Sequence, residues 1–415
     1  MTHTQGDPPI APRPLLNGRN IALCVTGSIA AYKAALLARL LVGEGAVVSV
    51  VMTQSAEQLI GPATFGGITN RAVHSQLFTG VGEPHVELAQ QSDLVVVFPA
   101  TADSLARFAQ GRANDLVTAL VLSATCPVLV APAMHPSMWS HPATQRNVRT
   151  LATDGRVQLI GPVDGEVASG ERGMGRMVEA ETMLSAIKAA LAPKDLKHKR
   201  LVITAGPTFE DIDPVRFIAN RSTGKMGFAL AERAVWRGAL VTLISGPTAL
   251  PTPTGACRTD VRSAEEMRTH LWGALHEDLQ GADALLMAAA VADHRPRTQS
   301  PTKLKRSGGA TALELTANPD LLAEVGNRRK GRRPALIGFA VETGTDEEVA
   351  RWASEKLAYK KVDLVVANPG AEALGRDDNR AQLISNGGSE RLQRLNKSDL
   401  ADRILDELVR LLAAD

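Results

Sequence analysis

The sequence predicts an α/β protein with two doubly wound parallel sheets, one in each half of the chain. Short apolar runs rich in β-branched residues alternate with segments that carry apolar residues at helical spacing, a pattern typical of parallel βαβ units. The length of 415 residues suits two or three domains. A charged segment interrupts the alternation, so we predict a first domain at 15–192, a linker at 193–200 and a second domain at 201–415.

The composition argues against several classes of protein. Hydrophobic residues make up 44% of the chain and charged residues 22%, a balance that favours folded domains with sizeable cores over disorder. The 46 basic and 44 acidic residues nearly cancel and aromatic residues are only 3%, so we expect no nucleic-acid partner. No apolar run reaches the roughly 18 residues of a membrane span, so we expect no membrane partner. The first residues, MTHTQGDPPIAPRP, are polar and rich in proline, so we expect no secretory signal.

The cysteines indicate a reducing compartment. Cys24, Cys126 and Cys257 lie in unrelated segments without metal-ligand spacing, and an odd, sparse set does not suit a disulfide framework. We therefore expect a cytoplasmic protein.

The first domain begins with a βαβ unit. An apolar strand at 20–25 ends in a turn of small residues, a helix follows at 29–42, and a second strand is expected at 46–52. The turn contains Gly27 and Ser28, whose backbone N–H groups and hydroxyl could bind a cofactor phosphate. It is not the GxGxxG fingerprint, and a tight turn without a ligand would use the same residues.

Two histidines flank later strand ends of this domain. A strand at 94–98 leads through small residues at 99–103 into a helix at 104–109; His85 precedes this strand, and His135 follows another at 128–130. Such strand ends line ligand crevices, although a lone histidine is more often a surface or core residue. The glycine-laced stretch 165–177 shows no periodicity and is expected to be a mobile loop, either a linker or a lid, before a helix at 179–192.

The second domain repeats the alternation. We expect strands near 201–205, 239–244, 283–289, 335–339 and 363–367, and helices near 224–237, 263–279 and 346–361. A loop rich in hydrogen-bond donors leads to the first helix and suits an anion at the helix N-terminus, although a solvated loop before an ordinary helix fits equally well. The donors in this loop are Arg216, Asn220, Arg221, Ser222, Thr223 and Lys225.

Further along, charged residues suggest a site for a metal-bound triphosphate. Asp293 follows the third expected strand, and Lys303 and Lys305 follow it within a polar stretch. Lys356 and Lys360 share a helix face at i, i+4 spacing and could add to the same field, although two such lysines are usually only solvated.

Taken together, the motifs resemble the family of bifunctional phosphopantothenoylcysteine decarboxylase / phosphopantothenate–cysteine ligases of coenzyme A biosynthesis, over nearly the whole chain. The matching segments of the first half are TGSIAAYK, PHVEL, PATAD, GRANDL, PAMHPSMW and GMGRM. Those of the second half are ITAGPT, DPVRFIANRSTGKMG, AAAVAD, KLK, NPD and GFAVET, a set that is highly specific to the ligase.

For the first half, the resemblance implies a Rossmann-like, flavodoxin-like flavoprotein domain that uses FMN. FMN oxidises the cysteinyl thiol, CO₂ is lost, and the reduced flavin returns the electrons. His85 matches the catalytic histidine, expected in proton transfer, and Met134 and His135 match substrate-binding positions. The implied FMN contacts are Gly27, Ser28, Thr53, Thr101 and Ser104.

For the second half, the resemblance implies a Rossmann-like ligase domain in which CTP and Mg²⁺ activate 4'-phosphopantothenate as an acyl-cytidylate for attack by L-cysteine. Asn220 is implied in catalysis, Arg216 and Ala290 in substrate binding, and Asp293 in metal binding. The implied CTP contacts are Asp293, Lys303, Lys305, Asn318, Pro319, Asp320, Phe339, Lys356 and Lys360. The resemblance also implies a homo-oligomer, in which the flavin halves form trimers and the ligase halves form dimers.

Two positions depart from the family pattern. His135 stands where many relatives have asparagine, and Ser169 stands where many have a flap cysteine that helps to reduce the enethiol; by position we count Ser169 as catalytic. Other readings are a flavin-binding regulatory subunit that inhibits phosphatases, against which the intact ligase half weighs, and a ligase whose flavin half is only oxidative.

Overall fold

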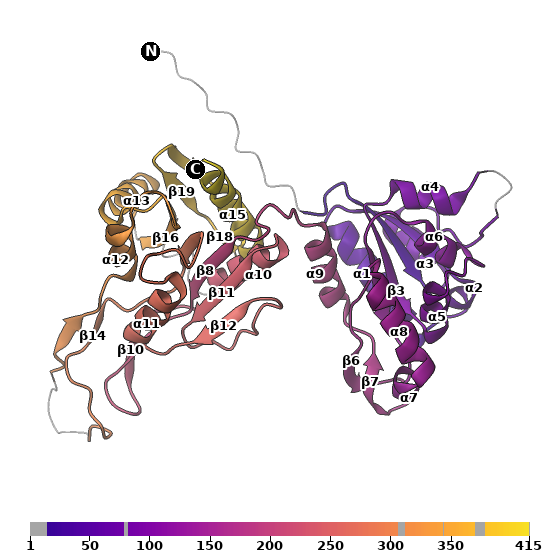
Figure 1. Cartoon of the computed structure of the whole chain (residues 1–415), viewed down its shortest axis with the longest axis horizontal. Coiled ribbons are helices and arrows are strands. Elements are labelled where there is room, and N and C mark those ends of the chain that lie inside the picture. The colour runs from indigo at the N-terminus through magenta and orange to yellow at the C-terminus, as the bar shows by residue number, and fades with distance from the viewer. Residues whose placement is uncertain (1–14, 79–81, 306–311, 343, 370–377, 415) are drawn as a thin grey trace, which may run out of the picture. The chain divides into compact units, whose positions relative to one another are not determined.

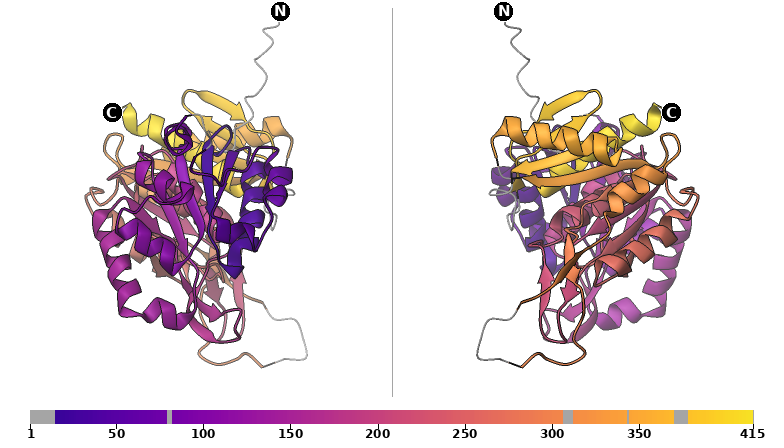
Figure 2. Two further views of the ribbon diagram at one scale, coloured as in Figure 1. Left: turned by 90° about the vertical axis from the view of Figure 1, so that its right-hand side faces the viewer. Right: turned by 90° about the vertical axis from the view of Figure 1, so that its left-hand side faces the viewer.

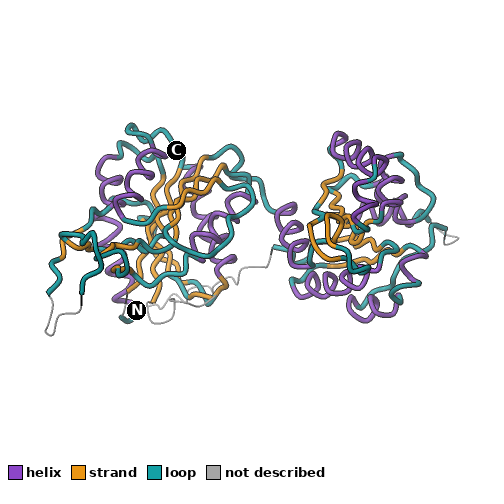
Figure 3. The backbone as a smooth tube through the Cα atoms, turned by 90° about the horizontal axis from the view of Figure 1, so that it is seen from below, coloured by secondary structure: helices purple, strands orange, loops and turns teal. Residues whose placement is uncertain are grey.

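The computed structural model describes residues 15–78, 82–305, 312–342, 344–369 and 378–414. The chain divides between Ala192 and Pro193 into two compact units. Each unit contains a mostly parallel sheet with helices on both faces, which confirms the predicted fold class (Figures 1 and 3).

The sheet of the first unit is five-stranded and parallel, in the order β2-β1-β3-β4-β5. This 2-1-3-4-5 order is flavodoxin-like, and it places the topological switch point between β1 and β3. The carboxyl ends of these two strands therefore flank the expected ligand crevice. The strands are β1 (Asn20–Val25), β2 (Val47–Met52), β3 (Leu94–Ala100), β4 (Val128–Pro132) and β5 (Val157–Leu159).

Both faces of this sheet are buried. Ile21, Leu23 and Val25 of β1 pack with α1, α3 and α9, whereas Ala22 and Cys24 pack with α4, α5, α6 and α8. Because alternate side chains enter two cores, the strand is a continuous apolar run. The helices are η1 (Ile29–Ala31), α1 (Tyr32–Gly43), α2 (Gln54–Glu57), α3 (Pro62–Thr69), α4 (Pro84–Gln91), α5 (Ala102–Ala109), α6 (Leu116–Ser123), α7 (Pro136–Ser140), α8 (Pro142–Asp154) and α9 (Ala180–Leu191).

The stretch 165–177 is largely an ordered hairpin rather than the expected irregular loop. Strands β6 (Val163–Glu166) and β7 (Arg172–Arg176) pair antiparallel. Its glycines hide the strand pattern in the sequence. Close packing requires one of them, because a Cβ on Gly175 would lie 2.4 Å from the carbonyl oxygen of Met134. The hairpin is thus held directly against the turn that follows β4.

The sheet of the second unit has the order β12-β11-β8-β13-β16-β17-β19-β20. Its parallel strands, numbered along the chain, follow the 3-2-1-4-5-6 order of dinucleotide-binding folds, so the switch point lies between β8 and β13. The strands are β8 (Arg200–Ala205), β11 (Leu240–Ser245), β12 (Cys257–Asp260), β13 (Ala284–Met287), β16 (Ala335–Glu342), β17 (Leu364–Pro369), β19 (Gln382–Ser385) and β20 (Gly388–Arg391).

Helices cover both faces of this sheet as well. One core contains residues of α10 and α15, and the other contains residues of α11, α12 and α13. The sequence interpretation gave no element after the strand near 363–367 and so missed α15. The helices are α10 (Lys225–Trp236), α11 (Ala264–Leu275), α12 (Leu321–Arg328), α13 (Asp346–Lys360) and α15 (Lys397–Ala413).

Residues 193–200, expected to be a linker, pack on the second unit. Leu196 is fully buried in its core, and the Leu196 N–H donates to the carbonyl oxygen of Arg237 at 3.1 Å. A single leucine among charged residues gives no periodic signal, which is why the sequence suggested a solvated connection. The structural unit thus begins at Pro193.

Short hairpins complete the second unit. The pairs β9 (Phe209–Asp211) with β10 (Phe217–Ala219), and β14 (His294–Pro296) with β15 (Leu315–Ala317), lie side by side at one end of the unit (Figure 2). A further small pair joins β18 (Asp378–Asn379) to β21 (Leu395–Asn396).

Candidate functional site

In the first unit, the strand ends at the switch point are tied together. The Thr26 hydroxyl donates to the carbonyl oxygen of Pro99 at 2.9 Å and accepts from the Thr101 N–H at 3.3 Å. Gly27 is required because a Cβ there would lie 2.4 Å from that of Ser55. Ser28 caps η1 by accepting from the Ala30 N–H at 3.3 Å, and its own N–H donates to the carbonyl oxygen of Thr26 at 2.9 Å. The turn is therefore held by its own hydrogen bonds, and the Ser28 hydroxyl keeps a proton that it can donate to a ligand.

A cavity of about 560 Å³ adjoins this turn. It brings together Ser28, Met134, His135 and Ser169, all of which were predicted site residues. Ser169 lines it from the exposed turn of the β6–β7 hairpin. The cavity also contains Lys33, which the motif TGSIAAYK includes but to which the sequence gave no role. The Lys33 ammonium is buried and pairs with the Glu179 carboxylate at 2.9 Å.

The other predicted flavin contacts cap helices. The Thr53 hydroxyl accepts from the Ala56 N–H at 3.2 Å. The Thr101 hydroxyl accepts from the Ser104 N–H at 3.2 Å and lies 3.0 Å from the Ser104 hydroxyl. These side chains lie at or near strand ends but do not line the cavity. Their hydroxyls are used by helix N-termini, so a ligand would meet preorganised caps rather than loose side chains.

His85 lies in the first turn of α4 and does not line the cavity. Its Nδ1 atom is buried, and no described group hydrogen-bonds to it. An unpaired buried polar atom costs roughly 1–3 kcal/mol, and such atoms in native proteins are commonly found at functional sites. The structure thus leaves His85 with an unused hydrogen-bonding atom.

His135 contacts the hairpin directly. Its Nε2 atom lies 2.9 Å from a carboxylate oxygen of Glu171. Its Nδ1 atom accepts from the Ser137 N–H at 3.3 Å and lies 2.7 Å from the Ser137 hydroxyl. The ring therefore joins the N-terminus of α7 to the hairpin.

In the second unit, glycines bring α10 close to the end of β8. Gly206 adopts φ +74°, and a Cβ there would lie 3.0 Å from the carbonyl oxygen of Gly246. A Cβ on Gly227 would lie 2.5 Å from that of Ala205, so the helix packs closely on the strand. Gly224 is the N-cap at φ +77° and supplies no side chain to the first N–H groups of the helix. This helix N-terminus therefore opens at the switch point.

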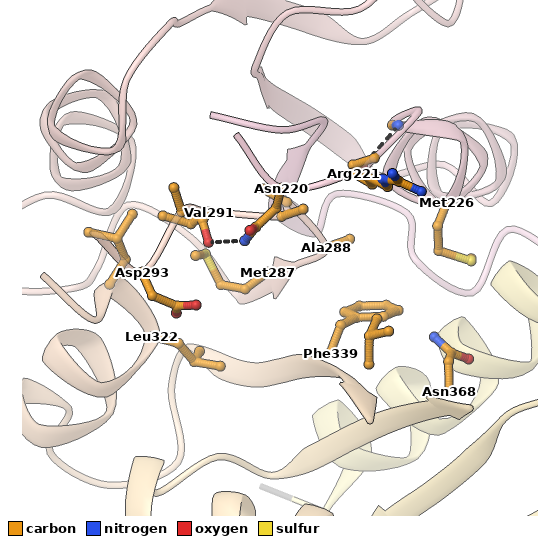
Figure 4. A pocket seen from close by; sticks show the side chains of 18 of the residues that line it. Asn220, Arg221, Met226, Met287, Ala288, Val291, Asp293, Leu322, Phe339 and Asn368 are labelled. Atoms are coloured by element: carbon orange, nitrogen blue, oxygen red, sulfur yellow. Dashed lines mark hydrogen bonds between the residues drawn. The ribbon is translucent and has the colours of Figure 1, made fainter. Parts of the chain in front are cut away.

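A cavity of about 750 Å³ lies there, between the carboxyl ends of the central strands (Figure 4). It gathers most of the predicted ligase residues: Asn220, Ala290, Asp293, Asn318, Pro319, Asp320, Phe339, Lys356 and Lys360. The Asn220 amide donates to the carbonyl oxygen of Val291 at 2.9 Å, which joins the loop before α10 to the segment after β13. Elements distant in sequence thus converge on one pocket.

The cavity carries paired cations beside acidic groups. The Lys356 ammonium donates to the carbonyl oxygen of Phe339 at 3.4 Å, and the Lys360 ammonium lies 2.8 Å from the Asp320 carboxylate. Burial, followed by the charge of Lys360, lowers the pKa of Lys356. A half-buried lysine beside another cation gains from an anionic ligand, so these two lysines differ from a fully solvated pair.

Other predicted residues do not line this cavity. The Arg216 guanidinium donates to the carbonyl oxygen of Leu304 at 2.7 Å, and it lies 3.6 Å from the Asp213 carboxylate. Lys303 and Lys305 are exposed on the segment before residues 306–311, which lie outside the described ranges. In this conformation, contacts near the β9–β10 hairpin hold Arg216 away from the pocket.

Sequence reasoning missed several polar groups that line the same cavity. Asn368 and Asn379 are both 4% exposed, and among the described residues their side-chain oxygens have no hydrogen-bond partner. Lys397 lines the cavity from the start of α15. Asn368 lies just after the predicted strand at 363–367, and this position was the available signal. Asn379 lies in a segment without a periodic pattern, whereas Lys397 begins a helix whose apolar spacing was not used.

Within the described ranges, no cluster of three or more His, Cys, Asp or Glu side chains could hold a metal ion. Mg²⁺ does not need such a cluster, because it is commonly bound by one or two carboxylates together with substrate phosphates. Asp293 lines the cavity and is compatible with that mode. In the same part of the chain, no helix combines the length and apolarity needed to cross a membrane.

Comparisons with known proteins match both units. Residues 11–192 match the family model described as Flavoprotein, and residues 196–412 match that of the DNA/pantothenate metabolism flavoprotein C-terminal domain. The chain is 42% identical over 398 residues to the coenzyme A biosynthesis bifunctional protein CoaBC of Vibrio cholerae, covering 94% of this chain and 98% of that protein. Against the protein of the same name from Mycobacterium tuberculosis, it is 44% identical over 411 residues, covering 95% and 97%.

Among solved structures, the chain is similar to the C-terminal domain of a coenzyme A biosynthesis bifunctional protein. The identity is 37% and the TM-score is 0.45, with 54% of this chain and 100% of that domain covered.

Proposed function

The chain belongs to the family of coenzyme A biosynthesis bifunctional proteins, and from this premise we propose that its two units catalyse successive reactions. The second unit joins L-cysteine to 4'-phosphopantothenate with CTP, through an acyl-cytidylate. The first unit then decarboxylates the product to 4'-phosphopantetheine with FMN. The observation that carries the proposal is the switch-point cavity of the second unit, where Asn220, Asp293 and the lysine pair converge.

In the ligase reaction, a carboxylate must become an electrophile. Lys356 and Lys360 hold the triphosphate of CTP, and Asp293 holds its Mg²⁺. Asn318, Pro319, Asp320 and Phe339 contact the nucleotide, and Ala290 lets the acid substrate approach the backbone. Asn220, already oriented by its bond to Val291, stabilises the acyl-cytidylate while the cysteine amine attacks. Arg216, Lys303 and Lys305 do not line the cavity, so we assign the triphosphate first to Lys356 and Lys360.

The carboxyl ends of the first unit's strands, together with the cavity beside them, suit FMN. The rigid turn at Gly27 and Ser28 offers the Ser28 hydroxyl to a phosphate. Thr53, Thr101 and Ser104 lie at or near neighbouring helix N-termini, and His85 has an unpaired ring nitrogen. Bound FMN would oxidise the cysteinyl thiol and later return the electrons. His85 moves a proton at the cysteinyl group, His135 holds the substrate carboxylate, and Met134 lines the substrate site. Ser169 supplies a proton at the final reduction, in place of a thiol.

We further propose that the protein acts in the cytoplasm as a homo-oligomer. Isolated cysteines fit a reducing compartment. Ile29, Tyr32 and Leu36 are 67%, 57% and 53% exposed at i, i+3 and i+7 spacing along η1 and α1. A row of exposed apolar side chains on one helix face favours contact with another copy of the chain.

The testing experiment uses purified full-length protein. We expect pyrophosphate release from CTP that requires 4'-phosphopantothenate, and CO₂ release after L-cysteine is added. Bound flavin alone would not distinguish the enzyme from a flavin-binding regulatory subunit, whereas CTP-dependent pyrophosphate release does. Bound flavin without any CTP consumption would overturn the ligase assignment.

A further inference from the structure

The tip of the β6–β7 hairpin is fastened to the opposite wall of the first unit's cavity by one side-chain contact. The Glu171 carboxylate lies 2.9 Å from Nε2 of His135, and their side chains are 65% and 29% exposed. His135 and the hairpin turn, including Ser169, line the cavity together. Glu171 therefore makes its contact at the mouth of the proposed decarboxylase site.

The hydrogen bonds of the imidazole determine which atom faces Glu171. Nδ1 accepts from the Ser137 N–H at the start of α7, so in the neutral ring the proton resides on Nε2. Nε2 then donates to the Glu171 carboxylate. The one ring donor that points away from the helix is therefore already occupied by a carboxylate.

The base of the hairpin is attached separately. The Met134 N–H donates to the carbonyl oxygen of Gly175 at 3.0 Å, and Gly173 and Gly175 allow β7 to lie against the turn at residues 134–136. These backbone contacts do not involve Glu171. Release of the Glu171 contact would thus free the tip while the base of the hairpin stays in place.

We propose that the Glu171 carboxylate mimics the substrate carboxylate and competes with it for the same hydrogen-bond donor. In the free protein it occupies the Nε2 donor of His135, and the carboxylate of the incoming cysteinyl group displaces it. This inference rests on the proposed function, in which His135 binds that carboxylate. Because CO₂ loss removes the carboxylate, Glu171 regains His135 after the reaction, and the tip closes on a product that no longer competes for the same donor. Glu171 is a positioning residue in this scheme and takes no part in the chemistry.

The test compares two unreactive ligands on the FMN-loaded protein by titration calorimetry. One is the substrate analogue with serine in place of cysteine, which keeps the carboxylate, and the other is the same molecule without its carboxylate. Glu171→Gln removes the competing charge while nearly preserving size. We expect it to bind the carboxylate analogue about twofold to fivefold more tightly, the range that an exposed ion pair can withhold. We expect unchanged affinity for the analogue without a carboxylate.

Asp164→Asn is the matched control. Asp164 lies on the same hairpin, is also exposed, and pairs with Arg172 at 3.3 Å instead of with His135. The Asp164→Asn substitution removes one negative charge, as Glu171→Gln does, and we expect the affinities of this control for both ligands to equal those of the wild type. An equal gain in the control would assign the effect to net charge and overturn the proposal, as would unchanged or weaker binding of the carboxylate analogue by Glu171→Gln.

A second measurement does not depend on ligand binding. Arg172 is exposed beside Glu171, so trypsin reports on release of the tip. Glu171→Gln should be cleaved after Arg172 faster than the wild type, and equal rates would overturn the proposed Glu171–His135 contact. Asp164→Asn does not serve as a control for this measurement, because it removes the ion pair of Arg172 itself. Wild-type decarboxylation is measured independently: its absence would overturn the proposed function, whereas intact decarboxylation without the Glu171 effects would overturn only this inference.

Discussion

At the scale of the residue, the protonation of Lys356 makes the charge of the ligase cavity depend on pH. Its pKa is lowered by burial and then by Lys360, so it loses its proton at a lower pH than an ordinary lysine. An anion favours the charged form, so nucleotide binding should be accompanied by proton uptake above the lowered pKa. We predict that CTP affinity falls as pH rises toward the ordinary lysine range, and that Lys356→Arg removes most of this dependence. Calorimetry in buffers of different ionisation enthalpy would measure both effects.

Two lysine-to-glutamine variants distinguish the loss of a charge inside the cavity from the loss of the same charge outside it. Lys356→Gln should weaken the activating step by roughly 2–4 kcal/mol, the loss expected for one aligned donor. Lys303→Gln, on an exposed segment outside the cavity, should change CTP binding little. If Lys356→Arg kept the full pH dependence, another group would be responsible for it.

The sequence could predict those residues of the candidate site that lie close to the ends of strands. Asn220, Ala290 and Asp293 lie close to the ends of predicted strands or the start of a helix, and parallel strands bring such positions together. Arg216 and Lys303 are on loops whose direction depends on hairpins that the sequence did not indicate. Asn379 was missed for the same reason, because a short strand outside the main alternation carries it into the cavity.

At the scale of the element, a partly buried ion pair joins α15 to α10 beside their shared apolar core. The Arg233 guanidinium of α10, only 4% exposed, lies 3.5 Å from the Asp402 carboxylate of α15. Burial raises the pKa of Asp402 from 3.8 to about 6, although Arg233 and Arg237 act in the opposite direction. Burial thus outweighs the attraction of the arginines.

This raised pKa has a definite consequence for stability. The folded state binds the Asp402 proton more tightly than the unfolded state, so this stabilisation is present below about pH 4 and is lost as pH rises through about 6. We predict that the difference in unfolding free energy between wild type and Asp402→Asn changes by about 1–3 kcal/mol across that window. Urea unfolding of a fragment starting at Pro193 would measure it. A constant difference would mean that the carboxyl titrates normally.

The main alternation of strands and helices was predictable because burial on both faces produces continuous apolar strands. The β6–β7 hairpin was not, because its glycines serve close backbone approach and remove the alternation of side chains. The helix α15 buries Leu400, Ile404, Leu405 and Leu408 at helical spacing, a signal that was present but not used.

At the scale of the whole molecule, the division into two units assigns residues 193–200 to the second. Leu196 is fully buried there, the Asp195 carboxylate pairs with the Arg237 guanidinium at 2.6 Å, and Arg237 also pairs with Asp406 of α15. The segment therefore helps to fix α10 and α15 to each other. A fragment that begins after it should be damaged even though every strand of the sheet is retained.

We predict that a 193–415 fragment folds and consumes CTP without flavin, whereas a 200–415 fragment is less stable. Loss of a buried leucine costs about 2–5 kcal/mol, and without Asp195 the buried Arg237 retains only its contacts with α15. Leu196→Ala within the longer fragment should reproduce the leucine part of the loss, and Asp195→Asn the remainder.

Urea midpoints and CTP-dependent pyrophosphate release would measure stability and function separately. Equal midpoints for the two fragments would show that residues 193–199 are only a tether, and a requirement for FMN in CTP consumption would contradict the independence of the second unit.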